Sequence, residues 1–173
     1  MVQLRDGEVA AFDTLYERHH RSLFNFLLRF IVDRATAEDL LQDVFLRVYL
    51  HRETYHPTAT FRTWLFTIAR NLAFDRLRQA WVTWESHNED RVLAIPDPSP
   101  NPERRVDAIE RLKQLEDALR QLSPGQREVL LLSRYAGLSY VEIAQVVGSS
   151  PGAVRVTLHR ALASLRKRVG SGG

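Results

Sequence analysis

The feature that most constrains this chain is a run between Ile95 and Pro102 in which every second residue is proline. Proline lacks a backbone N–H and has a fixed φ, so neither a helix nor a central strand tolerates it at this density. Four of the seven prolines lie in this run, which favours a semi-extended segment. We therefore predict two folded parts, residues 1–92 and 106–169, joined by a Pro-rich linker over 93–105. The Gly/Ser tail, 170–173, is expected to be disordered.

Apolar side chains on both sides of the run recur at spacings of three and four residues, the period of an amphipathic helix. No segment alternates apolar and polar residues as a half-buried strand would. The first predicted helix spans roughly 7–31, the second follows the capping residue Asp33 and runs through Val48, and the third begins at Phe61. Further helices are predicted over 106–122, 123–135 and 139–147, and a last one begins at Pro151. We predict an all-α fold with an N-terminal helix bundle and a C-terminal helix-turn-helix domain.

The last two predicted helices have the spacing of a helix-turn-helix motif. Ala144 is small enough for close helix approach, and Gly148 allows the turn. We expect the last helix to bury Val154, Leu158, Ala161, Leu162 and Leu165. The outward face of the same helix then contains Gly152, Val156, His159 and Arg160, and Arg155 lies beside this face. Arginine in this place binds guanine or phosphate, although short helix pairs also occur in bundles that bind no DNA.

Charge is unevenly distributed along the chain, although the formal net charge is only +3. No acidic residue follows Glu142, and the stretch 61–80 has four arginines against Asp75 alone, whereas 33–46 is acidic. This pattern predicts two polyanion-binding surfaces and one surface for another partner. All but two of the 24 Lys and Arg residues are arginine, which a GC-rich genome would explain equally well.

Several classes of protein are excluded. Without cysteine there is no disulfide, thiol nucleophile or Cys-based zinc site. Phosphate-binding Gly-rich loops and hydrolase motifs are missing, and His51, Glu53 and His56 lack a fourth metal ligand. We expect no catalytic site, metal, cofactor or small-molecule substrate. Apolar runs are too short for membrane insertion and Met1–Arg5 has no signal-peptide core, so a cytoplasmic location is expected.

Three C-terminal segments resemble the DNA-binding region of bacterial sigma factors: Leu122–Val129 (LSPGQREV), Gly137–Ala144 (GLSYVEIA) and Gly152–Ala161 (GAVRVTLHRA). In the N-terminal half, Ala37–Leu46 (AEDLLQDVFL) and Phe61–Arg78 (FRTWLFTIARNLAFDRLR) resemble the same family's polymerase-binding and DNA-melting region. Two such blocks joined by a short linker resemble the extracytoplasmic-function (ECF) subgroup. The resemblance covers most of the chain outside the linker and the tail.

The acidic segment places four residues at i, i+3, i+4 and i+7, hence on one helix face opposite the bundle core: Asp39, Gln42, Asp43 and Leu46. Solvated helix faces commonly have this pattern. The resemblance implies instead that this face binds the clamp helices of core RNA polymerase, with Leu46 as a small apolar anchor.

The third helix interleaves arginines and aromatics every four residues: Arg62, Phe66, Arg70, Phe74 and Arg78. Such a stripe binds phosphates and stacks on unpaired bases, although Phe66 and Phe74 fit the bundle core equally well. The resemblance implies that this helix, with Asn71, binds the minus-ten promoter element. It also implies that the loop from His51 to Thr60 receives a base flipped out of the opened duplex.

The resemblance assigns recognition of the minus-thirty-five element to the C-terminal part, through Arg127, Ser150, Gly152, Arg155, Val156, His159 and Arg160. Where the family often has Lys-Ser-Arg after a valine, this chain has Arg155-Val156-Thr157. The outward Val156 favours contact with a thymine methyl group. The promoter sequence therefore does not transfer from relatives.

Together these residues predict a sigma factor that binds core RNA polymerase and promoter DNA and helps to open the duplex. The resemblance also implies an anti-sigma factor as a partner. The main alternative is a helix-turn-helix regulator that dimerises through its N-terminal bundle, and a second is a helical adaptor without DNA contact. A dimer needs a self-complementary apolar face, whereas this chain offers an acidic face and an arginine-aromatic stripe.

Overall fold

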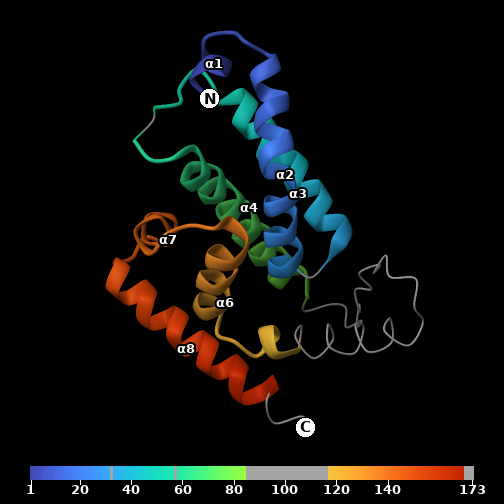
Figure 1. The fold of residues 1–173 in the computed structure, drawn as a ribbon. Helices are drawn as coiled ribbons and strands as arrows, with labels where there is room; N and C mark the ends of the chain where they lie inside the picture. Colours follow the sequence, from blue (N-terminus) through green and yellow to red (C-terminus); the bar gives the residue numbers. More distant parts are fainter. Residues whose placement is uncertain (32, 57, 85–116, 170–173) are drawn as a thin grey trace, which may run out of the picture.

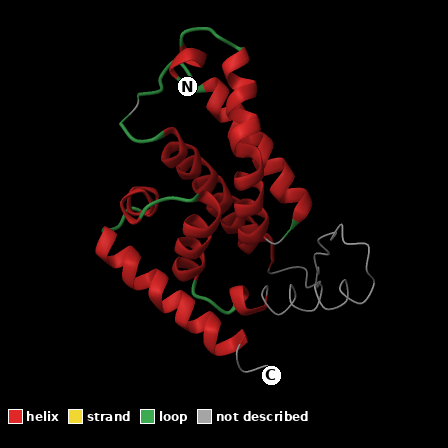
Figure 2. Ribbon diagram, viewed as in Figure 1, coloured by secondary structure: helices red, strands yellow, loops and turns green. Residues whose placement is uncertain are grey.

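The computed structural model describes residues 1–31, 33–56, 58–84 and 117–169, and every regular element in these ranges is helical (Figures 1 and 2). The predicted all-α fold is confirmed. The predicted linker, the predicted tail and most of the predicted helix over 106–122 lie outside the described residues; residues 117–120 are helical. The domain boundary at 93–105 therefore stays a prediction. Within the described ranges no helix is both long and apolar enough to span a bilayer.

The helices described in the N-terminal half are α1 Val2–Arg5, α2 Ala10–Ile31, α3 Arg34–Leu50 and α4 Phe61–Trp84. The short α1 was not predicted; its Leu4 is buried. Asp33 begins α3 as expected, because its carboxylate accepts a hydrogen bond from the Thr36 backbone N–H at 2.9 Å. Residues 51–56 and 58–60, between α3 and α4, form no regular helix, in agreement with the predicted loop.

The C-terminal half contains α6 Pro124–Leu131, a π-helical turn η1 Leu132–Ala136, α7 Tyr140–Val147 and α8 Pro151–Val169. Ser123 and Gln126 form the predicted capping box at the start of α6. Ser139 and Glu142 form a second box, which begins α7. Gly148 ends α7 with φ of +68°, a left-handed conformation that glycine adopts without steric cost.

One continuous apolar core joins the two halves. Phe26 of α2 and Phe66 of α4 are fully buried in it, as are Leu132 of η1 and Ile143 of α7. Helix α2 contacts η1 and α6, while α4 contacts α7. In Figure 1, α8 lies across the outer side of α6 and α7, away from α2 and α3. The described C-terminal helices thus pack directly on α2 and α4.

His19 of α2 is a buried histidine whose ring centroid lies 5.3 Å from that of Phe61. Burial, helped by the nearby Arg62 and Arg18, lowers the pKa of His19 from 6.5 to about 4. Between these two values the unfolded chain binds a proton that the folded chain does not bind. Above pH 6.5 the His19 ring is neutral in both states and imposes no penalty on folding. As the pH falls from 6.5 toward 4, only the unfolded chain gains the proton, so the free energy of unfolding falls.

We expect the free energy of unfolding to fall by up to about 3 kcal/mol between pH 7 and pH 4 because of His19 alone. In a His19→Leu variant this part of the pH dependence should disappear. Urea unfolding at several pH values measures it, with His51→Leu, at an exposed position, as the control. Equal pH dependence in wild type and His19→Leu would contradict the assignment.

Candidate nucleic-acid interface

The four predicted residues of α3, Asp39, Gln42, Asp43 and Leu46, are all exposed and share one face. Leu40, Val44 and Val48 on the opposite face are buried in the core. Leu46 is 55% exposed, and Leu50, one turn further along, is 61% exposed. Leu50 was missed in the sequence, although its spacing of four from Leu46 would have identified it. The outer face of α3 therefore combines the carboxylates of Asp39 and Asp43 with the exposed leucines Leu46 and Leu50.

The arginine-aromatic stripe on α4 is only partly exposed. Arg62, Asn71 and Arg78 face solvent, as a DNA-binding surface requires. Phe66 is fully buried, with its ring edge-on to Phe26 at a centroid distance of 5.4 Å. It therefore belongs to the bundle core, because a base could reach it only if α2 and α4 separated. The assignment of Phe66 to DNA binding is corrected accordingly.

Phe74 and Arg70 extend this stripe toward α2 and α6. The Phe74 ring is half-buried and lies edge-to-face with Phe30 of α2, at 5.2 Å between centroids. The guanidinium of Arg70 lies over the Phe74 ring, 4.7 Å from its centroid. This is a cation–π contact within α4. Phe74 therefore has one partner in the core and one at the surface.

Arg70 forms an ion pair with Glu128 of α6 through its Nε atom. The Glu128 side chain is only 6% exposed and that of Arg70 is 27% exposed. Burial raises the pKa of the Glu128 carboxyl group, and the hydrogen bond and charge of Arg70 oppose this rise. Glu128 was not predicted to be a site residue. An isolated acidic residue in a helix does not indicate a partner that lies 58 positions away in the sequence.

Arg127, predicted to contact the minus-thirty-five element, lies against α2 in this structure. Its guanidinium carbon lies 5.7 Å from the centroid of the Phe30 ring of α2. Burial, and then the charge of Arg120, lower the pKa of the Arg127 guanidinium. The side chain thus lies at the contact between the two halves in this structure. Its part in minus-thirty-five recognition stays a prediction.

Glu142 of α7 connects the C-terminal half to the start of α4. Its Oε1 accepts hydrogen bonds from the Thr60 hydroxyl at 2.9 Å and the Thr63 hydroxyl at 3.4 Å. Its Oε2 accepts from the backbone N–H of Ser139, and this bond is the main reason that the pKa of the Glu142 carboxyl group is lowered. A carboxylate thus lies at the junction of the 51–60 loop and α4.

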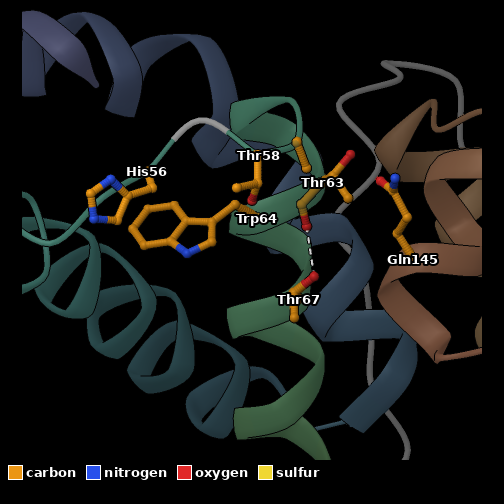
Figure 3. Close-up of a pocket in the computed structure, with 7 residues that line it drawn as sticks. His56, Thr58, Thr63, Trp64, Thr67 and Gln145 are labelled. Atoms are coloured by element: carbon orange, nitrogen blue, oxygen red, sulfur yellow. Dashed lines mark hydrogen bonds between the residues drawn. The ribbon is translucent and has the colours of Figure 1, made fainter.

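A cavity of about 280 Å³ opens beside this junction (Figure 3). The loop and α4 contribute most of its lining: His56, Thr58, Ala59, Thr63, Trp64 and Thr67. Gln145 of α7 lines it as well, and in Figure 3 it approaches from the side opposite His56. The cavity has the mixed aromatic and hydroxyl lining that suits a flat polar ring, and its volume is near the lower end, about 300 Å³, of ligand pockets.

The outward face of α8 agrees with the prediction. Exposed side chains or backbone are found at Gly152, Arg155, Val156, His159 and Arg160. Val154, Leu158 and Ala161 are buried on the opposite side, whereas Leu162, predicted to be buried, is 38% exposed. Ser150 begins the helix, because its hydroxyl accepts a hydrogen bond from the Ala153 backbone N–H at 3.2 Å.

Two family models match the chain: Sigma-70 region 2 over residues 15–83, and Sigma-70 region 4 over residues 112–165. RNA polymerase sigma factor CarQ of Myxococcus xanthus is 41% identical over 98% of this chain and 95% of its own length. ECF RNA polymerase sigma factor SigL of Mycobacterium tuberculosis is 37% identical over 92% of this chain and 89% of its own length. This chain is an ECF sigma factor of the sigma-70 family.

Solved structures of sigma factors share this fold over almost the whole chain. CnrH, solved in complex with the cytosolic domain of CnrY, is 26% identical, covers 99% of this sigma factor and 95% of its own chain, and has a TM-score of 0.74. The sigma factor RpoE, solved with the anti-sigma factor NepR from Bartonella quintana, has a TM-score of 0.78 at 23% identity and shows the fold alone. In this sigma factor, region 2 comprises α2–α4 and region 4 comprises α6–α8.

Proposed function

We propose that this ECF sigma factor binds core RNA polymerase, recognises two promoter elements and helps to open the duplex between them. The observation that carries the proposal is the order of matched regions in one chain, region 2 followed by region 4. Each region has an exposed face with the chemistry of its proposed partner. The protein would act in the cytoplasm, as a specificity factor without a catalytic site, cofactor or metal. No observation favours the alternative of a dimeric helix-turn-helix regulator.

The outer face of α3 is the proposed contact with the clamp helices of the polymerase. Asp39, Gln42 and Asp43 supply polar contacts, and Leu46 supplies an apolar anchor. Leu50 extends this anchor along the same face. An exposed leucine pair bordered by carboxylates is typical of an interface with a small apolar centre and a charged rim.

The exposed part of α4 and the neighbouring cavity are the proposed minus-ten site. Arg62, Arg70 and Arg78 would bind phosphates, while Asn71 and Phe74 would contact bases. The cavity beside Trp64 would hold one base flipped out of the stack, since flipped bases are read by stacking and by hydrogen bonds to their edges. Thr63, Thr67 and His56 supply groups for such hydrogen bonds.

The exposed face of α8 is the proposed minus-thirty-five site. Arg155 and Arg160 would bind guanine or phosphate, and Val156 would contact a thymine methyl group. Ser150 and Gly152 lie at the start of α8, and His159 is exposed together with Arg155, Val156 and Arg160. The space beside Gly152 is open, since a Cβ atom placed there would have no neighbour within 4 Å. Because glycine has no side chain to fill this space, the DNA backbone can approach the helix closely there.

The two regions would act as separate domains, 1–92 and 106–169, on the promoter. The two elements are centred roughly 25 base pairs apart, or about 85 Å along B-form DNA. The Pro-rich linker, 93–105, would set the separation of the two domains.

We also propose an anti-sigma factor as a regulatory partner. CnrH, similar to this chain over almost its full length, was solved in complex with the cytosolic domain of CnrY. An inhibitor of this kind would cover the proposed polymerase and DNA surfaces at the same time.

Run-off transcription with core RNA polymerase and a pool of genomic fragments tests the proposed function. The holoenzyme should select a small set of promoters that core polymerase alone ignores. If no promoter is selected, the proposed function is wrong.

We expect Arg155→Ala and Arg160→Ala each to weaken promoter binding and to reduce the salt dependence of binding. Loss of one phosphate contact lowers the slope of log K against log salt by about 1. Binding of holoenzyme to a selected promoter at several salt concentrations measures this slope. Arg21→Ala, exposed on α2, is the matched control. An unaltered slope in both variants would mean that another face of α8 binds the DNA.

A further inference from the structure

Helix α8 presents an outward face whose middle line carries no charge. Gly152, Val156 and Ala163 lie along this line, and all three are exposed. Val154 and Ala161 are buried on the opposite side of the helix. Because glycine and alanine project little or not at all, Val156, of which 45% is exposed, is the side chain that stands out from the middle of the face.

Arginines flank this middle line on both sides. Arg155 and Arg160 are five positions apart, which corresponds to about 140° around an α-helix. Val156 lies between them in angle, about 100° from Arg155 and about 40° from Arg160. Both arginines are exposed, and α8 contains no carboxylate that could pair with them. An anion can therefore bind a guanidinium group on either side of Val156.

A helix that enters the major groove of DNA meets phosphates at its flanks and base edges at its middle. The groove is about 12 Å wide, and a sugar-phosphate backbone runs along each of its walls. Helix-turn-helix domains insert the first turns of their last helix into it. Arg155 and Arg160 then reach phosphates of opposite strands, while Val156 reaches the floor. The open space beside Gly152 lets the helix lie deep enough for this contact.

The side chain of Val156 limits what it can recognise on the floor of the groove. An isopropyl group neither donates nor accepts a hydrogen bond, so it gains nothing from the amino, carbonyl and ring-nitrogen groups of the bases. The apolar group that the major groove offers is the 5-methyl group of thymine. 5-Methylcytosine carries the same methyl group at the same ring position, whereas cytosine and uracil lack it.

We propose that Val156 is the specificity-determining residue of α8 and that it recognises the 5-methyl group of a pyrimidine in the minus-thirty-five element. The proposal rests on the proposed function and deepens it, because it assigns Arg155 and Arg160 to phosphates and leaves base recognition to Val156. It also means that 5-methylcytosine can replace thymine at this position. Methylation of a cytosine there would then raise the affinity of the sigma factor for the promoter.

Deoxyuridine tests the contact, because it presents the thymine base without its 5-methyl group. Each thymine of the minus-thirty-five element in a promoter selected by run-off transcription is replaced in turn. Affinities of holoenzyme for these duplexes are measured with the wild type, Val156→Ala and Val141→Ala. Val141 is the matched control, since it is a valine of α7 that is 56% exposed.

We expect the wild type to lose affinity about fourfold at one thymine, the usual effect of one buried methyl or methylene group. Val156→Ala should bind the thymine and deoxyuridine duplexes equally, because its shorter side chain no longer reaches the methyl group. Val141→Ala should show the loss of the wild type. When a C·G pair replaces the T·A pair at this position, 5-methylcytosine should bind about fourfold more tightly than cytosine.

Three results would overturn the proposal. The first is a wild type that binds every deoxyuridine duplex as tightly as the thymine duplex, and the second is an equal loss in Val156→Ala. The third is a changed base preference in Arg155→Ala or Arg160→Ala, because phosphate contacts should weaken all duplexes by the same factor. His159→Ala, at the exposed position one turn beyond Arg155, should keep the discrimination between thymine and deoxyuridine.

Run-off transcription separates the failure of this proposal from that of the proposed function. If the wild type selects promoters but ignores the 5-methyl group, recognition by Val156 is disproved and the sigma activity stands. If no promoter is selected, the proposed function fails, and the deoxyuridine series is repeated on duplexes that the full chain selects from a randomised pool. A fourfold loss that depends on Val156 there supports the methyl contact, and a chain that selects no duplex refutes both.

Discussion

Reversal of one charge on α3, Asp43→Arg, should abolish binding to core RNA polymerase and leave the fold intact. Asp43 is exposed between Gln42 and the buried Val44, so arginine fits there without disturbing the core. If this face binds a complementary basic surface, the variant places two like charges together. This costs several kcal/mol, and we expect the affinity to fall by at least about 100-fold. Affinity for core polymerase, measured with labelled sigma factor, checks the effect.

The control for this variant is Glu17→Arg, the same charge reversal at an exposed position of α2. It should bind the polymerase like the wild type. Thermal unfolding should be similar for all three proteins, since exposed substitutions change stability by about 0.5 kcal/mol or less. Undiminished co-purification of Asp43→Arg with core polymerase would refute the assignment of this face.

Truncation of the buried ring in Phe66→Ala should destabilise the protein by about 3–5 kcal/mol, the usual cost of removing a buried phenylalanine. Phe66 is fully buried against Phe26, so the lost contacts are those of the α2–α4 core. Urea unfolding of the purified variant measures the change. Poor expression of the variant would agree with the same cause.

Asn71→Ala is the control on the exposed side of α4. Its stability should stay within about 0.5 kcal/mol of the wild type, while its DNA binding should fall. A Phe66→Ala protein of wild-type stability that fails only in promoter opening would restore the sequence-based interpretation, in which Phe66 stacks on a base.

Local features of this chain were predictable because they depend on neighbours in sequence. The capping residues Asp33 and Ser123 begin the helices they were expected to begin. The exposed face of α3 also followed from its spacing alone, as did that of α8 apart from Leu162. In each case the buried stripe of an amphipathic helix determines which residues face outward.

Predictions failed or stayed open where a side chain meets a distant segment. Phe66 and Phe74 have the same spacing from an arginine, yet one is buried by α2 and the other is half-exposed. Periodicity cannot separate them, because the cover of each ring depends on how α2 packs against α4. Arg127 belongs to a motif of the family, but its position against Phe30 depends on how region 4 packs on α2.

The sequence by itself determined the helical fold class, the helix caps, the family motifs and the positions of the charged faces. These depend on residues at most a few turns apart, for which helix geometry sets the spacing. The tertiary structure decided what those faces contact. It paired Arg70 with Glu128, 58 positions later, and it placed Glu142 and Gln145 beside the cavity at α4. Such contacts arise from the burial of an apolar surface shared by both halves, which acts between whole helices and leaves no local pattern in the chain.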